Sequence, residues 1–442
     1  MSSAEGFKVI VVGGGPVGLT AAHALTKAGI DFVMLEGREE AVTKAGSHIV
    51  LTAVGLHALA GMGLGDAISK VSIDLPTFKR INDKGQDIGA LNFFEWQKRD
   101  IGCYPKVISR YDLTRTLYES LPAEAQAKIL TGKRVSDIKT DGEGVKVTCK
   151  DGTQYTGSLV IGADGAHSVV RQHMRSLALE AGSNEINEEK PYLTTYRCIV
   201  IQFHRSLSDR IYPGLATETH SKGACTQLFA GQETGVCGIY EKMEAPTRDR
   251  IRYTQDDQEA IIERLGHLPL LEGGGLTIRD VYKNKVDSLM VSLEEGVVEH
   301  WSYDGRIVLA GDAVHKFTPI TGAGCNNGMV DVAALANEMH KAFRGAATNS
   351  GEGRAIPSRA QLASAFKAYQ EKRFDEATQQ CATASRVTAT SSWATGMHSF
   401  IDRYVLGYKL LQWGMYKRAK VPEPIPFYFE DEKAAAAIAS VA

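Results

Sequence analysis

The segment from Phe7 to Arg38 constrains the fold more than any other part of the chain. An apolar, β-branched run of strand length stops at three consecutive glycines, and a helical pattern with one apolar face begins at Pro16. A second apolar run, from Asp31 to Leu35, follows that helix. The pattern predicts a strand–helix–strand unit of an α/β fold, with the glycines at the first strand-to-helix turn.

The glycine spacing in this unit is typical of a dinucleotide-binding turn. Gly13 permits the tight turn, Gly15 lets the backbone approach a pyrophosphate on helix N–H groups, and Gly18 allows close packing of helix and strand. Glu36, eighteen residues after Gly18, can accept hydrogen bonds from ribose hydroxyls. The flanking strand, helix and acid make this a stronger indication than G-x-G-x-x-G alone, but they leave the identity of the dinucleotide open.

Composition excludes several other classes. With 442 residues the chain can form about two or three domains. A net charge of −2 gives no general attraction to nucleic acid or anionic membrane. The seven cysteines lie apart without a C-x-x-C pair, no secretory signal is seen, and no metal-ligand spacing occurs. We therefore expect a cytoplasmic protein with no metal, no nucleic-acid partner and no stable membrane insertion.

Strand and helix patterns alternate along the rest of the chain. Expected strands cover residues 9–12, 31–35, 48–51, 159–162, 192–204, 223–229, 235–240, 285–293 and 301–310, with hairpins within 78–96 and 135–155. Expected helices cover residues 16–28, 52–68, about 113–121, 255–265, 328–344, 359–386 and 397–418.

This alternation predicts one discontinuous α/β domain interrupted by β-rich insertions. The dinucleotide-binding domain is expected to comprise residues 1–78, 106–178 and 286–350. A β-sheet substrate domain would take residues 79–105 and 179–285, and residues 351–442 would form a C-terminal helical region.

Two further glycine-rich stretches bear on the dinucleotide. The first places Asp164 in Gly-x-Asp-Gly at the end of a strand. The second begins with Asp312, which can hold a sugar-alcohol chain, and continues through Gly322, Gly324 and Cys325 into a helix. The N–H groups and positive dipole at that helix start suit a group that becomes anionic, such as the N1–C2=O edge of a reduced flavin.

Taken together, these motifs resemble the single-component flavoprotein monooxygenases of the para-hydroxybenzoate hydroxylase fold, over roughly residues 7 to 345. The sequences GDAVHKFTP, TGAGCNNG and TTYRCIV look most like fungal secondary-metabolite enzymes that oxygenate prenylated indole alkaloids, indole diterpenes and meroterpenoids. The resemblance implies a Rossmann-like, GR2-type FAD-binding domain, an inserted antiparallel-sheet substrate domain, and C-terminal helices.

The resemblance also implies roles for individual residues. Cofactor contacts are expected from Glu36 at the adenosine ribose, Val50 beside the flavin, Arg110 at the pyrophosphate, Asp164 in a motif tied to FAD and NADPH, Asp312 at the ribityl chain, and Cys325 facing the isoalloxazine. Arg197 matches an arginine that projects toward flavin and substrate, which makes it a catalytic candidate. His220 stands where relatives have a tyrosine and is the second catalytic candidate.

Each of these roles has a structural alternative. Arg110 could be a surface arginine, Arg197 could pair with a carboxylate, and His220 could be a solvated loop residue. A stripe of apolar and aromatic residues near the C-terminus recurs at about four-residue spacing. We expect it to be the core face of a helix rather than a membrane anchor. Its members are Phe400, Tyr404, Tyr408, Leu411 and Met415.

The implied reaction uses transiently bound NADPH and O2. Reduced FAD would form a C4a-hydroperoxide, whose distal oxygen epoxidises or hydroxylates an electron-rich, hydrophobic small molecule. The best match is an indole 2,3-bond, with or without semipinacol rearrangement to a spiro-oxindole, or a prenyl alkene.

Three rival functions are open or disfavoured at this stage. A phenol or aromatic-acid hydroxylase of the same fold and a non-catalytic FAD-fold binding protein both stay open. A flavin-dependent halogenase is disfavoured, because the four tryptophans lie far apart and the Trp-x-Trp-x-Ile-Pro signature of that family is missing.

Overall fold

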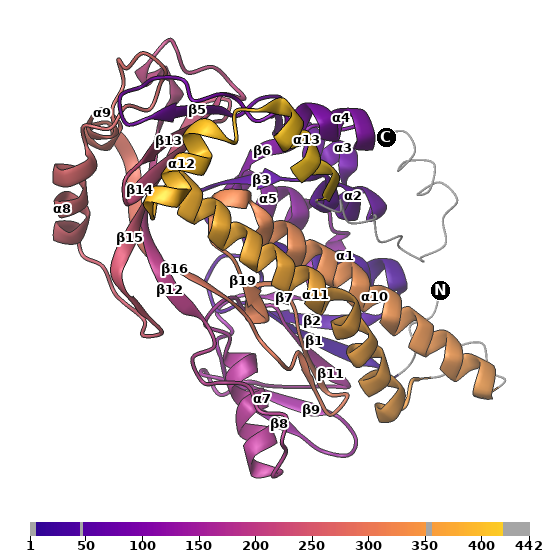
Figure 1. Cartoon of the computed structure of the whole chain (residues 1–442). Helices are drawn as coiled ribbons and strands as arrows, with labels where there is room; N and C mark the ends of the chain where they lie inside the picture. Colours follow the sequence, from indigo (N-terminus) through magenta and orange to yellow (C-terminus); the bar gives the residue numbers. More distant parts are fainter. Residues whose placement is uncertain (1–5, 45–46, 351–355, 419–442) are drawn as a thin grey trace.

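A six-stranded sheet in the order β17-β18-β11-β1-β2-β7 forms the centre of the first half of the molecule. All neighbouring strands are parallel except β17 and β18. The computed structural model describes residues 6–44, 47–350 and 356–418 (Figure 1). Central strands are apolar on both faces, as expected for a parallel sheet covered on both sides. The strands are β1 (Lys8–Val12), β2 (Asp31–Leu35), β7 (Ile129–Leu130), β11 (Leu159–Gly162), β17 (Ser302–Tyr303) and β18 (Ile307–Leu309).

Helices and two small sheets surround this sheet. Helix α1 packs against α10 and α5, while α7 packs on β18 and β8. The helices are α1 (Pro16–Ala28), α2 (Ala53–Gly61), α3 (Gly65–Val71), α5 (Arg110–Glu119), α6 (Ala123–Gln126), α7 (Val169–Glu180) and α10 (Ala323–Ser350). The small sheets contain β3 (His48–Leu51), β6 (Lys106–Ser109) and β4 (Ile73–Asp74), and β10 (Gln154–Gly157), β9 (Val145–Cys149) and β8 (Val135–Thr140).

A seven-stranded sheet in the order β19-β16-β12-β15-β14-β13-β5 forms the second half. Its pairings are antiparallel, except that β13 and β5 are parallel. The strands are β5 (Lys79–Asn82), β12 (Leu193–His204), β13 (Ala216–Ser221), β14 (Ala224–Ala230), β15 (Thr234–Thr247), β16 (Lys285–Val297) and β19 (His315–Lys316).

The two faces of this sheet have different neighbours. The inner face carries Tyr196, Cys198 and Tyr240, which pack with Ile320 of the glycine loop. The outer face carries the alternate residues, such as Ile199, which pack with α8 (Gln255–Leu265) and α9 (Ile278–Lys283). Figure 1 shows α8 on the far side of the sheet from α10 and α11. The inner face is therefore the one turned toward the six-stranded half.

Three C-terminal helices cross between the two halves. Helix α11 (Arg359–Ser391) runs beside α10 and reaches β13, β14 and β16 (Figure 1). It is followed by α12 (Gly396–Tyr404) and by α13 (Lys409–Arg418), which packs on α4 (Phe93–Ile101). Within the described ranges, no helix combines the length and the hydropathy needed to cross a bilayer.

The predicted α/β fold with an inserted antiparallel sheet is confirmed, but several elements differ from the expected ones. The helix expected over 52–68 is two helices, because Gly63 has a φ of +81° and Leu64 N donates to Leu59 O, which ends α2 in a Schellman turn. The strand expected over 301–310 is a hairpin that turns at Asp304 and Gly305, both with positive φ.

Other differences concern the inserted sheet and its borders. The hairpin turn at residues 83–85 forms, but past a single bridge at Asp87 the chain becomes helix α4 instead of a second strand. Strand β13 was not expected, and helix α10 begins five residues before Gly328. The domain boundary placed at 286 needs correction, since β16 pairs along its length with β12 of the seven-stranded sheet.

The aromatic stripe near the C-terminus is the largest departure. The helix expected over 397–418 is divided into α12 and α13, and Phe400, Tyr404 and Tyr408 are 56%, 61% and 65% exposed. Leu411 and Met415 are also about half exposed. The prediction that these residues form a core face is therefore wrong.

Candidate active site

The turn after β1 has two glycines that packing requires and one that leaves space. Gly13 has a φ of +103°, and a Cβ there would lie 2.5 Å from Ala163 O. A Cβ on Gly18 would lie 1.9 Å from Gly13 O. A Cβ on Gly15 would meet no protein atom within 4 Å, and Gly15 caps α1 without a side-chain bond. The first N–H groups of α1 thus face open space of the kind a pyrophosphate needs.

Glu36 lies beside this turn at the end of β2. Its side chain is buried, and its Oε2 accepts a hydrogen bond from Gly14 N at 2.6 Å. Its Oε1 accepts from Arg38 N at 2.7 Å and from Arg38 Nε at 3.0 Å. Burial raises the pKa of Glu36, but the bonds from Arg38 and Gly14 outweigh it and leave the pKa below its usual value. The carboxylate is therefore ionised at the position where a ribose is expected.

Asp164 follows β11 at the same edge of the sheet. Its Oδ2 accepts from Val169 N at 2.7 Å and Val170 N at 3.1 Å, which caps α7. Burial raises the pKa of this carboxyl. Its Oδ1 is buried and has no hydrogen-bond partner among the described residues. One oxygen of Asp164 is thus left to meet a group outside the protein.

Asp312 and the glycine loop adjoin the end of β18. Asp312 Oδ2 accepts from Lys316 Nζ at 3.2 Å, and a Cβ on Gly324 would lie 3.7 Å from its Oδ1. Burial raises the pKa of Asp312, whereas the nearby Lys316 lowers it, with a smaller lowering by Arg110. The lowering effects are larger together, so the pKa of Asp312 is below its usual value. Burial raises the pKa of Cys325 to about 12, which keeps it a thiol and fits a packing role.

Asn326 joins the loop to Val50, a contact that sequence reasoning missed. Its Nδ2 donates to Val50 O at 2.8 Å and to Gly322 O at 2.7 Å, and its Oδ1 accepts from Thr52 N at 2.9 Å. A Cβ on Gly55 would lie 2.0 Å from Asn326 Oδ1, so this approach needs glycine. The available signal was the asparagine that follows the glycine loop in the first turn of α10, but nothing local indicated its partners.

A buried charged cluster supports the same loop from behind. His315 Nε2 lies 2.6 Å from Asp331 Oδ2, which also accepts from Gly311 N at 3.0 Å. Arg373 of α11 donates to Asp331 Oδ1 at 3.0 Å and to Asn327 Oδ1 at 2.8 Å. We call these residues the Asp331 cluster. It fixes Gly311, and with it the neighbouring Asp312, relative to α10 and α11.

Arg110 begins α5 and is exposed on the same side. Its backbone N donates to Ser47 O at 2.9 Å, which places it next to β3 and Val50. It lies close enough to lower the pKa of Asp312 and Cys325. Its guanidinium forms no hydrogen bond or ion pair within the part of the chain that the structure describes. The expected cofactor residues are thus gathered at one edge of the sheet, with a free cation beside them.

Arg197, the first catalytic candidate, lies on the outer face of the seven-stranded sheet. Its Nε donates to Glu241 Oε2 at 2.7 Å, and Glu241 also binds Arg264 of α8 at 2.8 Å. The glycine loop packs on the opposite face. The placement of Arg197 therefore contradicts its expected projection toward the flavin and supports the structural alternative.

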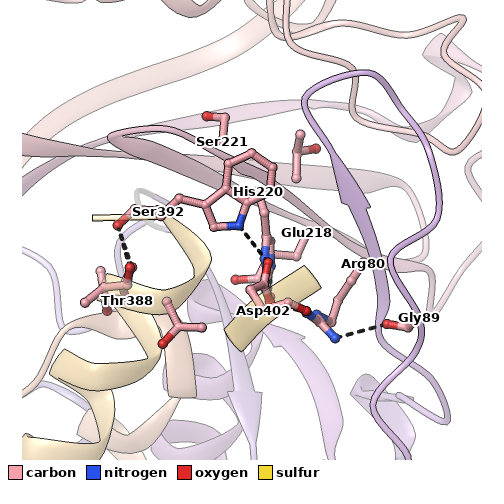
Figure 2. A network of polar contacts seen from close by, with 12 residues as sticks. Arg80, Gly89, Glu218, His220, Ser221, Thr388, Ser392 and Asp402 are labelled. Atoms are coloured by element: carbon pink, nitrogen blue, oxygen red, sulfur yellow. Dashed lines mark hydrogen bonds and ion pairs between the residues drawn. The ribbon is translucent and has the colours of Figure 1, made fainter. Parts of the chain in front are cut away.

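His220, the second candidate, is on the inner face but is not a solvated loop residue. It is 2% exposed on β13, with Nδ1 2.7 Å from Asp402 Oδ2 and Nε2 3.3 Å from Glu218 Oε2. Asp402 also accepts from Arg80 and from Trp393 Nε1. Figure 2 shows Asp402 together with Arg80, Glu218 and His220 from close by. We call this set the Asp402 cluster. Burial lowers the pKa of His220, but Glu218 and Asp402 outweigh it and raise the pKa overall.

Known proteins decide which dinucleotide the site takes. The family model described as "FAD binding domain" matches residues 6–367. The chain belongs to this family. It is 34% identical to the FAD-dependent monooxygenase DEP2 of Alternaria brassicicola, over 84% of this chain and 69% of that protein. It is 33% identical to the FAD-dependent monooxygenase srdH of Neurospora crassa, over 84% of this chain and 83% of that one.

A solved structure gives the same fold at lower identity. The structure of Klebsiella pneumoniae HpxO complexed with FAD and uric acid matches with a TM-score of 0.69 and 21% sequence identity, over 93% of this chain and 96% of that one. The protein is thus an FAD-dependent monooxygenase that uses NAD(P)H, and the expected fold and cofactors are confirmed.

The residues at the sheet edge fit FAD. Bound FAD would fill the open space at Gly15 and would pair with the Arg110 guanidinium and the Asp164 Oδ1, which have no partner among the described residues. Among the described residues, no group of His, Cys, Asp or Glu side chains could hold a metal ion.

Proposed function

We propose that this enzyme transfers one oxygen atom from O2 to an electron-rich carbon of a neutral, hydrophobic molecule in fungal secondary metabolism. The proposed target is an indole 2,3-bond, with or without semipinacol rearrangement, or a prenyl alkene. The observation that carries the proposal is the character of the inner sheet face beside the glycine loop, where apolar side chains are partly open and charged ones are paired within the protein.

The apolar part of this face begins next to the loop. A Cβ on Gly322 would lie 3.4 Å from Val50 Cβ, and Val50 packs in one cluster with Phe78, Phe94 and Phe229. The ring centroids of Phe78 and Phe94 are 6.3 Å apart, and those of Phe78 and Phe229 are 5.8 Å apart. Phe94 and Phe229 are only partly buried, so they leave aromatic surface that suits an indole or isoprenoid group.

The cationic side chains of the face are already paired within the protein. Arg80 and His220 project from neighbouring strands on this face, and both bind Asp402. Gln227 Nε2 donates to Ile320 O at 2.9 Å, and Tyr240 Oη donates to Gln227 Oε1 at 3.0 Å. These groups hold α12 and the loop against the sheet, and so they are not available to pair with a phenolate or carboxylate of a substrate. This favours a neutral substrate over the aromatic acid of the rival hydroxylase function.

The protein's own residues position the cofactor and exclude water. When bound and reduced by NADPH, FAD supplies the activated oxygen. We propose that Glu36 holds the adenosine ribose, Arg110 the pyrophosphate and Asp312 the ribityl chain. The N–H groups at the start of α10, around Gly324 and Cys325, would stabilise negative charge on the flavin. The Val50 and Phe229 side chains would exclude water from the reacting carbon.

Coupled NADPH oxidation tests this proposal. Prenylated indoles should stimulate oxidation by the wild type and gain one oxygen atom, whereas simple phenols should not. Replacing Phe229 by Ala should lower kcat/KM for the indoles by about tenfold while FAD stays bound. Tyr212→Ala, at a tyrosine that is 49% exposed, is the matched control and should leave kcat/KM unchanged. Stimulation by phenols alone would favour the aromatic hydroxylase instead.

A further inference from the structure

Helices α12 and α13 bury two polar side chains completely and leave several large apolar side chains exposed. Their most deeply buried side chains are Asp402 and Gln412, both at 0% exposure. Seven large apolar or aromatic side chains on the same stretch are 47–81% exposed. We call these seven the apolar face. They are Met397, Phe400, Tyr404, Tyr408, Leu410, Leu411 and Met415. Amphipathic helices on a water-soluble surface have the reverse arrangement.

Buried polar contacts fix this orientation. Asp402 attaches α12 to Arg80 and Trp393. Gln412 attaches α13 to the segment before α4, because its Nε2 donates to Ala90 O at 3.2 Å and its Oε1 accepts from Asn92 N at 3.0 Å. Turning either helix to bury its apolar side chains would separate these polar groups from their hydrogen-bond partners. The outward direction of the apolar face is therefore built into the fold.

Aromatic packing against α4 also holds α13 in place. The ring centroid of Trp96 on α4 lies 5.1 Å from that of Trp413 and 5.5 Å from that of Tyr416. Arg99 of α4 lies over the Trp413 ring at 4.7 Å. On α13 the apolar face is thus the side turned away from α4, and an exposed apolar patch of this kind marks an interaction site.

Charge identifies the partner. The three exposed ionised side chains of α12 and α13 that flank the apolar face, Arg403, Lys409 and Lys417, are all basic. Asp100 of α4 adjoins Lys417 and is paired with Arg99 at 2.7 Å. The carboxylate on these helices, Asp402, is buried and paired. Two copies of this surface would bring like charges together, which disfavours self-association. An apolar stripe bordered by Lys and Arg is the pattern that binds the interface of an anionic bilayer.

We propose that the apolar face docks this enzyme on an anionic lipid bilayer. Its apolar side chains enter the boundary between headgroups and acyl chains, and the flanking basic side chains lie among the lipid phosphates. The helices lie on the bilayer and do not cross it. Docking also brings lipid close to α4, whose Phe94 lies in the proposed substrate surface, a consequence that rests on the proposed function.

Co-sedimentation of the full chain with vesicles tests the docking. The vesicles contain phosphatidylcholine with about one-third phosphatidylserine, and binding should weaken with added salt. The double variant Met397→Glu/Leu410→Glu should bind at least about tenfold more weakly. Leu179→Glu on α7, at a leucine that is 46% exposed, is the matched control and should bind as the wild type does.

A charge reversal gives a second, independent readout. Lys409→Glu should weaken binding by about fivefold, and Lys150→Glu, at an exposed lysine after β9, should not. All these positions are exposed, so each variant should keep its FAD absorbance and its unfolding temperature. NADPH oxidation with a soluble indole should also persist in each variant, which separates failure of docking from failure of the proposed reaction.

Three results would overturn the proposal. One is wild-type protein that stays in the supernatant with anionic vesicles. Another is a dimer in light scattering that Leu410→Glu converts to monomer, which would make the face a contact between copies of the chain. The third is hydrogen exchange of residues 400–411 that, without vesicles, is slower in the full chain than in a chain ended at residue 418, which would assign the face to residues 419–442.

Discussion

The molecule contains two buried clusters of the same composition, each with an aspartate between a histidine and an arginine. Asp331 lies between His315 and Arg373 behind the glycine loop. Asp402 lies between His220 and Arg80 on the inner face of the seven-stranded sheet. In both, burial raises the pKa of the aspartate, and the cationic partners outweigh it and lower the pKa overall. The clusters differ in what surrounds them.

The Asp331 cluster binds a backbone N–H of the cofactor site, whereas the Asp402 cluster contains a second carboxylate. Asp331 accepts the Gly311 N–H, one residue before Asp312. The Asp402 cluster instead includes Glu218, whose Oε1 is buried without a hydrogen-bond partner in the described part of the chain. The first cluster therefore positions the cofactor loop. The second anchors α12, and its contribution to stability depends on the protonation of His220.

The largest effect should come from Asp331→Asn. An amide N–H would face the donors that Asp331 now accepts and leave Arg373 buried with a weaker partner, so the free energy of unfolding should fall by about 3–5 kcal/mol. The purified variant should also lose FAD, because Gly311 is no longer fixed. Denaturant unfolding and flavin absorbance measure the two effects.

Asp249→Ala is the control for that variant. Asp249 pairs with Lys190 at 2.6 Å on the exposed surface, so its loss should leave the free energy of unfolding close to the wild-type value. An Asp331→Asn protein that is as stable as the wild type and binds FAD fully would refute the role assigned to the Asp331 cluster.

Asp402→Asn should have a smaller effect and one of a different kind. Arg80 keeps its hydrogen bond to Gly89 O at 3.2 Å and His220 keeps Glu218, so the expected loss of unfolding free energy is about 1.5–3 kcal/mol. FAD content should stay at the wild-type level, and hydrogen exchange should increase in α12. Loss of FAD comparable to that of Asp331→Asn would erase the distinction between the clusters.

The third effect is a pH dependence that belongs to the Asp402 cluster. Since the folded-state pKa of His220 is raised above 6.5, its stabilising contribution is complete below pH 6.5 and is lost as the pH rises through the folded-state value. Unfolding free energy should therefore fall above pH 6.5 in the wild type, by at most about 1.4 kcal/mol per pH unit, relative to His220→Gln. His267→Gln, at an exposed histidine, should keep the wild-type slope.

The smallest effect should come from Arg197→Ala. Its partner Glu241 keeps Arg264, and the pair is partly exposed on the outer face, so stability should change by about 0–1 kcal/mol. Product formation and FAD content should match those of the wild type. Arg264→Ala, which removes the other partner of Glu241, is the matched control. A selective loss of product formation in Arg197→Ala would restore the catalytic role expected from the sequence.

Sequence reasoning reached the parts of the site that short segments determine. The turn at Gly13, Gly15 and Gly18 and the acid at Glu36 are specified within one strand–helix–strand unit, so their geometry is local. Asp164 and Asp312 each follow a strand of the parallel sheet, β11 and β18, and neighbouring parallel strands end at the same sheet edge.

The contacts that were missed join residues far apart in the chain. Asn326 binds Val50, and His220 binds Asp402, with no local pattern to indicate either pair. The side of β12 on which Arg197 lies depends on strand register, and a shift of one residue exchanges the two faces. The C-terminal stripe was misplaced because buried Asp402 and Gln412, and not the apolar residues, decide which side of α12 and α13 faces inward.

The most direct test of the account is an 18O2 reaction with a prenylated indole and a phenol present together. Purified enzyme with FAD and NADPH should incorporate one 18O atom into the indole product, with no label in the phenol. Label in the phenol alone, or NADPH oxidation that yields only hydrogen peroxide with both compounds present, would contradict the assignment of the inner face to a neutral, electron-rich substrate.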